Sequence, residues 1–157
     1  MAKPRDKTRL TRRRGRALTI RIETIAHTEQ RYDTCGDWWF TPDNGSLEMR
    51  ISELGNTRYE MLVAMHELTE ALSCLFAGIT TKQVDRFDFP WRPHGLYGEP
   101  GDDPKAPYHT QHDAGIVVER FLAHEWEVDW EQYGEAMRNL PTWRKRTGSG
   151  QRTDKRR

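Results

Sequence analysis

The sequence predicts an α+β protein in which a small antiparallel sheet with a hairpin packs on two main helices. Two segments, 18–23 and 47–51, place apolar residues at every second position, which is the spacing of a β-strand with one buried face. Two later segments, 58–77 and 107–126, place apolar residues at steps of three and four, which is the spacing of an amphipathic helix. The strands therefore precede the main helices along the chain.

A β-hairpin is predicted over residues 37–52. Its first strand, around 37–41, contains three consecutive aromatic residues, a type that favours strands. The turn falls at Pro42-Asp43-Asn44-Gly45, because Asn and Gly tolerate the positive φ angles that tight hairpin turns need. The second strand then returns over 47–51.

The helix over 58–77 is the most regular element of the sequence. Thr57 and Glu60 have the spacing of a capping box at its start, and Gly78 is a suitable C-terminal stop. The rest of the chain is predicted as a short helix from Thr81 to about Phe87 capped by Thr80, an irregular Pro- and Gly-rich loop over 89–107, the helix over 107–126, and a last short helix from Asp129 to about Asn139.

Charge divides the 157-residue chain into three parts, although the formal net charge is only +1. Residues 1–16 hold eight Lys and Arg against one Asp, and residues 142–157 hold seven against one Asp. The segment 17–141 holds 10 basic and 22 acidic residues. We therefore expect a single acidic globular domain that binds metal over 17–141, between two basic disordered tails.

The two tails are candidate contacts for DNA or RNA, because clustered cations bind phosphates and release counterions. The candidate residues are Arg12, Arg13, Arg14, Arg16, Arg144, Lys145 and Arg146. No apolar run is long enough to cross a membrane, and no secretory signal is recognisable at the start of the chain. Two cysteines without a paired motif favour a reducing, cytoplasmic setting. The oligomeric state is left open.

The motif with the clearest chemistry is His66-Glu67-Leu68-Thr69-Glu70, inside the helix over 58–77. Residues four apart on a helix project from one face, so His66 and Glu70 can supply two ligands to one metal ion. Glu67 is turned by about 100° from His66. It would lie beside the metal, where it could act on a bound water rather than bind the ion itself.

These five residues resemble the metal-binding helix of the zincin metallopeptidases, in which two histidines bind zinc, the intervening glutamate is the general base, and a later helix supplies a third ligand. The resemblance implies a zinc-dependent, peptidase-like hydrolase with a peptide substrate and Glu67 as its catalytic base. Glu70 stands where that family has its second histidine. The chain also resembles small uncharacterised phage-encoded proteins with a similar helix, which would place it in the host cytoplasm.

The third ligand is predicted to come from His109-Thr110-Gln111-His112-Asp113 at the start of the second main helix. His109, His112 and Asp113 can share one helix face, since they are three and four residues apart. We prefer His112, because it lies deeper in the helix. His109 and Asp113 remain alternatives, either as a fourth ligand or as partners of the ligands.

Two other functions remain open from the sequence. The first is a non-catalytic protein that associates with nucleic acid, in which a structural metal or a polar network joins the two helices. The second is a metal-dependent phosphohydrolase of the HD class, since His112-Asp113 is an HD dipeptide and Asp129 could supply a further carboxylate.

Overall fold

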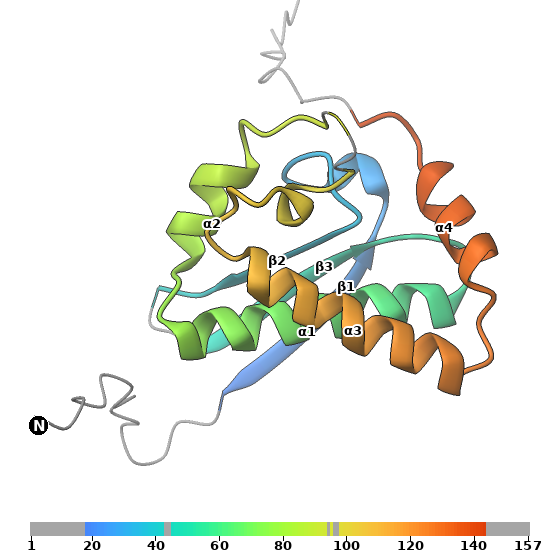
Figure 1. The fold of residues 1–157 in the computed structure, drawn as a ribbon, viewed down its shortest axis with the longest axis horizontal. Helices are drawn as coiled ribbons and strands as arrows, with labels where there is room; N and C mark the ends of the chain where they lie inside the picture. Colours follow the sequence, from blue (N-terminus) through green and yellow to red (C-terminus); the bar gives the residue numbers. More distant parts are fainter. Residues whose placement is uncertain (1–17, 43–44, 94, 96–97, 144–157) are drawn as a thin grey trace, which may run out of the picture.

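The computed structural model describes residues 18–42, 45–93, 95 and 98–143, and these form an α+β fold (Figure 1). The elements are β1 (Thr19–Ile25), β2 (Gly36–Phe40), β3 (Ser46–Ser52), α1 (Thr57–Ala77), α2 (Thr81–Asp88), α3 (His109–Glu125) and α4 (Trp130–Arg138), with short 3-10 turns at His27–Glu29 and Pro100–Asp102. The predicted α+β class and the order of the strands and main helices are confirmed. Residues 1–16, residues 144–157 of the second predicted tail, and the centre of the predicted turn at 43–44 lie outside the described residues.

The sheet is mixed, so the prediction of an antiparallel sheet is wrong at one strand. The strand order is β1-β3-β2. The predicted hairpin is present, because β2 pairs antiparallel with β3 with Trp38 opposite Met49. β1 pairs in parallel with β3, with Ile22 opposite Met49. The alternation of apolar residues shows that a segment is a strand but not its direction. Residues 26–35 carry the chain past the position that β3 fills, so β3 returns between β1 and β2 and runs parallel to β1.

A side chain caps the start of α1 and a glycine backbone ends it, although the N-cap differs from the prediction. Asn56 is the N-cap, since its side chain accepts the Arg58 N–H at 2.9 Å. The predicted capping box with Thr57 is wrong, because the Glu60 carboxylate instead accepts the Leu54 N–H at 3.0 Å. At the other end Gly78 adopts a left-handed φ of 75°, as expected for a helix stop.

The helix α1 contacts β2 and β3 of the sheet and also contacts α3, which places it at the centre of the molecule (Figure 1). An apolar core that includes Leu47, Met49, Ile51, Leu62 and Cys74, all at most 1% exposed, joins the sheet to α1. None of the helices in the described part of the chain combines the length and hydropathy that crossing a bilayer requires.

The facing surfaces of α1 and α3 bury polar residues. His66 and Glu70 of α1 are buried, and so are His112 and Glu119 of α3. Large apolar residues on the same helices face solvent instead: Phe76 and Phe121 are each 61% exposed and Val117 is 68% exposed. Burying charged groups is costly unless they are paired, so this contact between the helices needs a specific polar site.

Candidate metal centre

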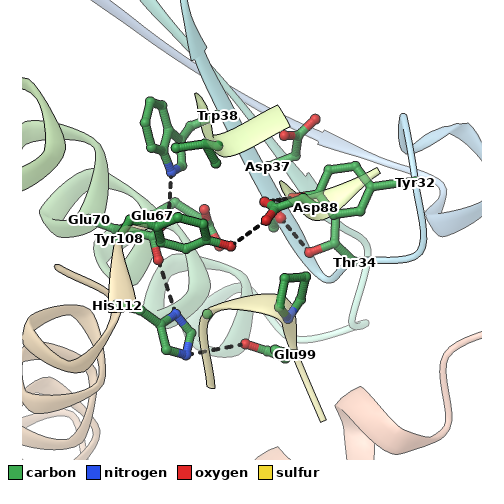
Figure 2. Close-up of a pocket in the computed structure, with 14 residues that line it drawn as sticks. Tyr32, Thr34, Asp37, Trp38, Glu67, Glu70, Asp88, Glu99, Tyr108 and His112 are labelled. Carbon is green, nitrogen blue, oxygen red and sulfur yellow. Dashed lines mark hydrogen bonds and ion pairs between the residues drawn. The ribbon is translucent and has the colours of Figure 1, made fainter. Parts of the chain in front are cut away.

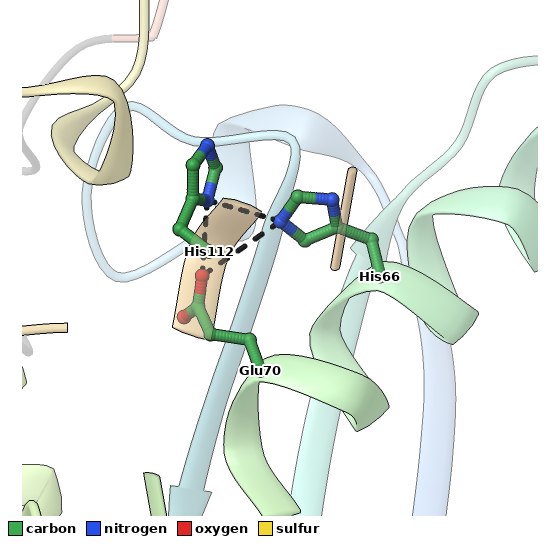
Figure 3. A group of neighbouring side chains, drawn as sticks. All are labelled: His66, Glu70 and His112. Atoms are coloured by element: carbon green, nitrogen blue, oxygen red, sulfur yellow. Dashed lines mark hydrogen bonds and ion pairs between the residues drawn. The ribbon is translucent and has the colours of Figure 1, made fainter. Parts of the chain in front are cut away.

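Three buried side chains from α1 and α3 converge on one point (Figure 3). His66 Nε2 lies 3.0 Å from His112 Nδ1, and His112 Nδ1 lies 3.0 Å from Glu70 Oε2. His66 Nε2 and Glu70 Oε2 are 3.7 Å apart. The three residues are only 4–6% exposed.

The triangle of these three atoms has the size of a metal-binding face. Zinc binds nitrogen and oxygen at about 2.0–2.2 Å in a tetrahedron, so its ligand atoms lie roughly 3.3 Å from one another. The three measured separations, 3.0, 3.0 and 3.7 Å, bracket this value. Two histidines and one carboxylate could therefore hold a divalent metal after small side-chain movements, and would leave a fourth position for water or substrate.

Each of these three residues uses its second polar atom to contact another side chain. His66 Nδ1 donates to Glu119 at 3.0 Å. Glu70 Oε1 accepts the indole N–H of Trp38 at 2.8 Å. His112 Nε2 lies 3.3 Å from Asp102. Such partners fix the orientation and the protonated nitrogen of ligating histidines, and they leave one atom of each residue free to face a metal.

Small residues make room for the site. A Cβ added to Gly101 would lie 2.3 Å from the ring of His112, and a Cβ added to Gly36 would lie 2.4 Å from Glu67 Oε1. Both distances are far shorter than a van der Waals contact. The turn at Pro100–Asp102 therefore packs directly on His112, and β2 packs directly on the Glu67 side chain.

The surroundings of the three converging residues favour the charged form of each side chain. Burial by itself lowers the pKa of His66, but its hydrogen bond to Glu119 and its close ion pair with Glu70 raise that pKa to about 11. The pKa of His112 likewise rises to about 10, since Asp102 and Glu70 outweigh its burial. Burial would raise the pKa of Glu70, but its hydrogen bond with His112 and its ion pair with His66 lower it to about 2. A bound cation would replace the protons shared among these atoms.

A pocket opens beside the converging residues (Figure 2). Glu67, Glu70 and His112 line it together with the backbone of Gly36 and Gly101. Burial, and then the nearby charge of Glu70, raises the pKa of Glu67 well above its ordinary value. Sequence reasoning placed Glu67 next to the proposed ligands, and the structure puts it in the same pocket.

The far wall of the pocket carries a buried carboxylate with two phenols. Asp88 accepts the hydroxyl of Tyr108 at 2.6 Å and the hydroxyl of Tyr32 at 3.1 Å (Figure 2). Burial, which outweighs these hydrogen bonds, raises the pKa of Asp88 to about 7. The pocket therefore holds ionisable groups on both of its walls.

His109 and Asp113 do not join the converging group. His109 Nδ1 donates to the Gly101 carbonyl at 2.8 Å, and its Nε2 lies 3.7 Å from the exposed Asp113 carboxylate. His109 therefore holds the turn that covers His112. Asp129 caps α4 by accepting the Glu131 N–H at 3.0 Å. The two carboxylates that an HD-type centre would need are thus used elsewhere.

The sequence did not predict the residues that hydrogen-bond to the proposed ligands and orient them. Glu119 accepts from His66 and also from the Tyr133 hydroxyl, and neither Glu119 nor Tyr133 belongs to a recognisable motif. One signal was available: His112, Gly115, Glu119 and Ala123 recur at helical spacing along α3, and all four are buried. The seven basic candidates in the tails lie outside the described residues.

No protein-family model, curated protein or solved structure matches this chain. The class of protein is therefore defined by its site: a small α+β domain with a buried histidine–glutamate–histidine group that could hold a divalent metal.

Proposed function

We propose that this protein is a zinc-dependent hydrolase of the zincin type that cleaves a peptide or amide bond. The observation that carries the proposal is the convergence of His66 Nε2, Glu70 Oε2 and His112 Nδ1 beside the pocket that Glu67 lines. Two histidines and a carboxylate with an open fourth position are a ligand set of catalytic zinc sites.

The order of the elements also supports a likeness to zincins. The first two ligands come four residues apart from one helix, α1, and the third comes from a later helix, α3. The glutamate that follows the first histidine lines the pocket rather than joining the ligands. The departure at Glu70 keeps a donor atom in place, since carboxylates also bind zinc.

In this proposal each residue has a separate task. Bound zinc would polarise the substrate carbonyl and lower the pKa of water. His66, Glu70 and His112 would hold the ion, and Glu119, Trp38 and Asp102 hold those three side chains in place.

Glu67 takes the proton of the attacking water and passes it to the leaving amine. Gly36 leaves room for the Glu67 carboxylate at the pocket wall, because a side chain at position 36 would displace it.

Zinc content and turnover, measured on the same preparations, test the proposal. We expect about one zinc per chain in the wild type and chelator-sensitive cleavage of a fluorogenic casein. His66→Ala should lose both. Glu67→Gln should keep zinc and lose activity by about 100-fold or more. His124→Ala is the matched control, because His124 is an exposed histidine in the last turn of α3.

Two results would overturn parts of this proposal. Protein without zinc, in wild type and His66→Ala alike, would refute the metal site. A Glu67→Gln variant that keeps both zinc and full turnover would refute the role of Glu67. Zinc without any detectable cleavage would favour the second candidate function, a structural metal that joins α1 to α3.

We also propose that the protein associates with DNA or RNA through its basic tails. The charge pattern of the sequence favours this, because the cations gather at 1–16 and 142–157 while 17–141 is acidic. Such an association is compatible with either a catalytic or a structural metal.

A further inference from the structure

β1 lies at an open edge of the sheet. Within the described residues, β3 is the strand that pairs with β1. Thr19 donates its N–H to Gly45 at 3.1 Å, and Ile25 accepts the Glu53 N–H at 2.8 Å, so the odd-numbered residues of β1 turn their main chain toward β3. The main chain of Ile20, Ile22 and Thr24 is therefore directed toward the open edge. Such an edge is a template for another strand.

Apolar side chains of β1 are also exposed to solvent. Ile20 and Ile22 pair with Leu47 and Met49 of β3, so they lie on the same face of the sheet. Leu47 and Met49 are at most 1% exposed, whereas Ile20 and Ile22 are 43% and 42% exposed. The apolar face that forms the core therefore continues past the part of the sheet that is buried.

The charges on the opposite face of β1 specify a partner. Arg21 and Glu23 lie 3.9 Å apart within the strand, and their side chains remain 65% and 46% exposed. If a second copy of β1 pairs antiparallel about a two-fold axis at Ile22, Arg21 lies opposite the partner's Glu23, and Glu23 opposite the partner's Arg21. An axis at Arg21 would pair two arginines, and an axis at Glu23 would pair two glutamates. Opposite charges across antiparallel strands stabilise pairing and like charges oppose it.

The hydrogen-bonding groups select the same register. With the axis at Ile22, Ile22 of one copy lies opposite Ile22 of the other, and Ile20 lies opposite Thr24 of the other copy. These are the residues whose N–H and C=O groups point to the open edge, so the whole strand can form an antiparallel ladder. An axis at Ile20 would shorten the ladder and would leave Glu23 opposite position 17, before the strand begins.

We propose that two copies of this chain form a dimer in which their β1 strands pair antiparallel about Ile22, joining the two sheets into one. The dimer places the exposed isoleucines of the two strands next to each other and pairs Arg21 with Glu23 twice. None of the residues of the candidate metal centre lies on β1, so the dimer and the metal site can succeed or fail independently.

A charge-complementation experiment tests the dimer on the full chain. Molar mass in solution, measured by light scattering over a range of concentrations, should show a dimer for the wild type. Arg21→Glu and Glu23→Arg each place like charges opposite each other twice, so each variant alone should weaken dimerisation by about tenfold or more. An equimolar mixture of the two variants restores opposite charges at both positions and should dimerise again.

Controls separate this interface from others. Lys82→Glu reverses an exposed charge on α2 and should leave the dimer unchanged. Circular dichroism checks that each variant is folded. A monomeric wild type would overturn the proposal. It would also be overturned if both single variants stayed fully dimeric, or if their mixture stayed monomeric while each was folded.

Discussion

Glu119→Gln tests whether the residues behind the proposed ligands prepare them for a metal. Glu119 accepts from His66 at 3.0 Å, and its other oxygen accepts from the Tyr133 hydroxyl. The substitution keeps the size of the side chain but removes the charge and one of the two acceptor oxygens. Loss of such a carboxylate partner weakens metal binding by about 10- to 100-fold. This corresponds to about 1.4–2.8 kcal/mol of binding free energy.

The assay is a competition titration of zinc against a chromophoric chelator at constant pH. Glu125→Gln on the same helix is the control, because Glu125 is exposed and should leave the zinc affinity unchanged. Thermal unfolding of both variants shows whether they fold as the wild type does. A Glu119→Gln protein that is folded and binds zinc as tightly as the wild type would refute the argument that Glu119 orients His66.

Three further predictions concern packing, pH and the tails. Gly101→Ala should destabilise the protein by about 1–3 kcal/mol in urea unfolding and weaken zinc binding, because its Cβ would meet the His112 ring at 2.3 Å; unchanged stability would contradict this contact. Asp88 has a folded-state pKa raised to about 7, so the stability it contributes is full below its unfolded pKa and is lost as the pH rises through 7. The wild type should therefore lose unfolding free energy relative to Asp88→Asn between pH 4 and 8, and a constant difference would contradict the raised pKa. Deleting 1–16 and 142–157 should abolish DNA and RNA binding at low salt in a mobility-shift assay, and binding that survives the deletion would exclude the tails as the contact.

Local sequence signals located the main helices and strands and most of their ends, although not the N-cap of α1. Gly78 ends α1, Asp129 caps α4, and Thr80 with Gln83 forms a capping box on α2, each as its residue type predicts. These signals act within a few residues, so the sequence displays them directly. The direction of β1 depends on which strand it meets after a crossover, and no local pattern encodes that choice.

The proposed ligands could be predicted in part for the same reason. His66 and Glu70 share a helix, so their spacing alone places them on one face. The choice of His112 over His109 depended on depth in α3, and the structure brings His112 to the other two residues while His109 binds the Gly101 carbonyl.

The apolar pattern was misleading about which helix faces are buried. The apolar spacing that predicted a helix over 107–126 includes Val117 and Phe121, yet both residues are more than 60% exposed. The buried face carries His112 and Glu119 instead. Apolar periodicity cannot identify a face whose burial depends on mutual pairing of charged groups, and such pairing involves residues far apart in the sequence.

X-ray absorption at the zinc edge tests the central claim most directly. On zinc-loaded full-length protein we predict a first shell of nitrogen and oxygen at about 2.0–2.2 Å with imidazole scattering. That shell should be lost in His112→Ala. A protein that retains no zinc, or a shell dominated by sulfur at about 2.3 Å, which would indicate the cysteines, would contradict a centre built from His66, Glu70 and His112.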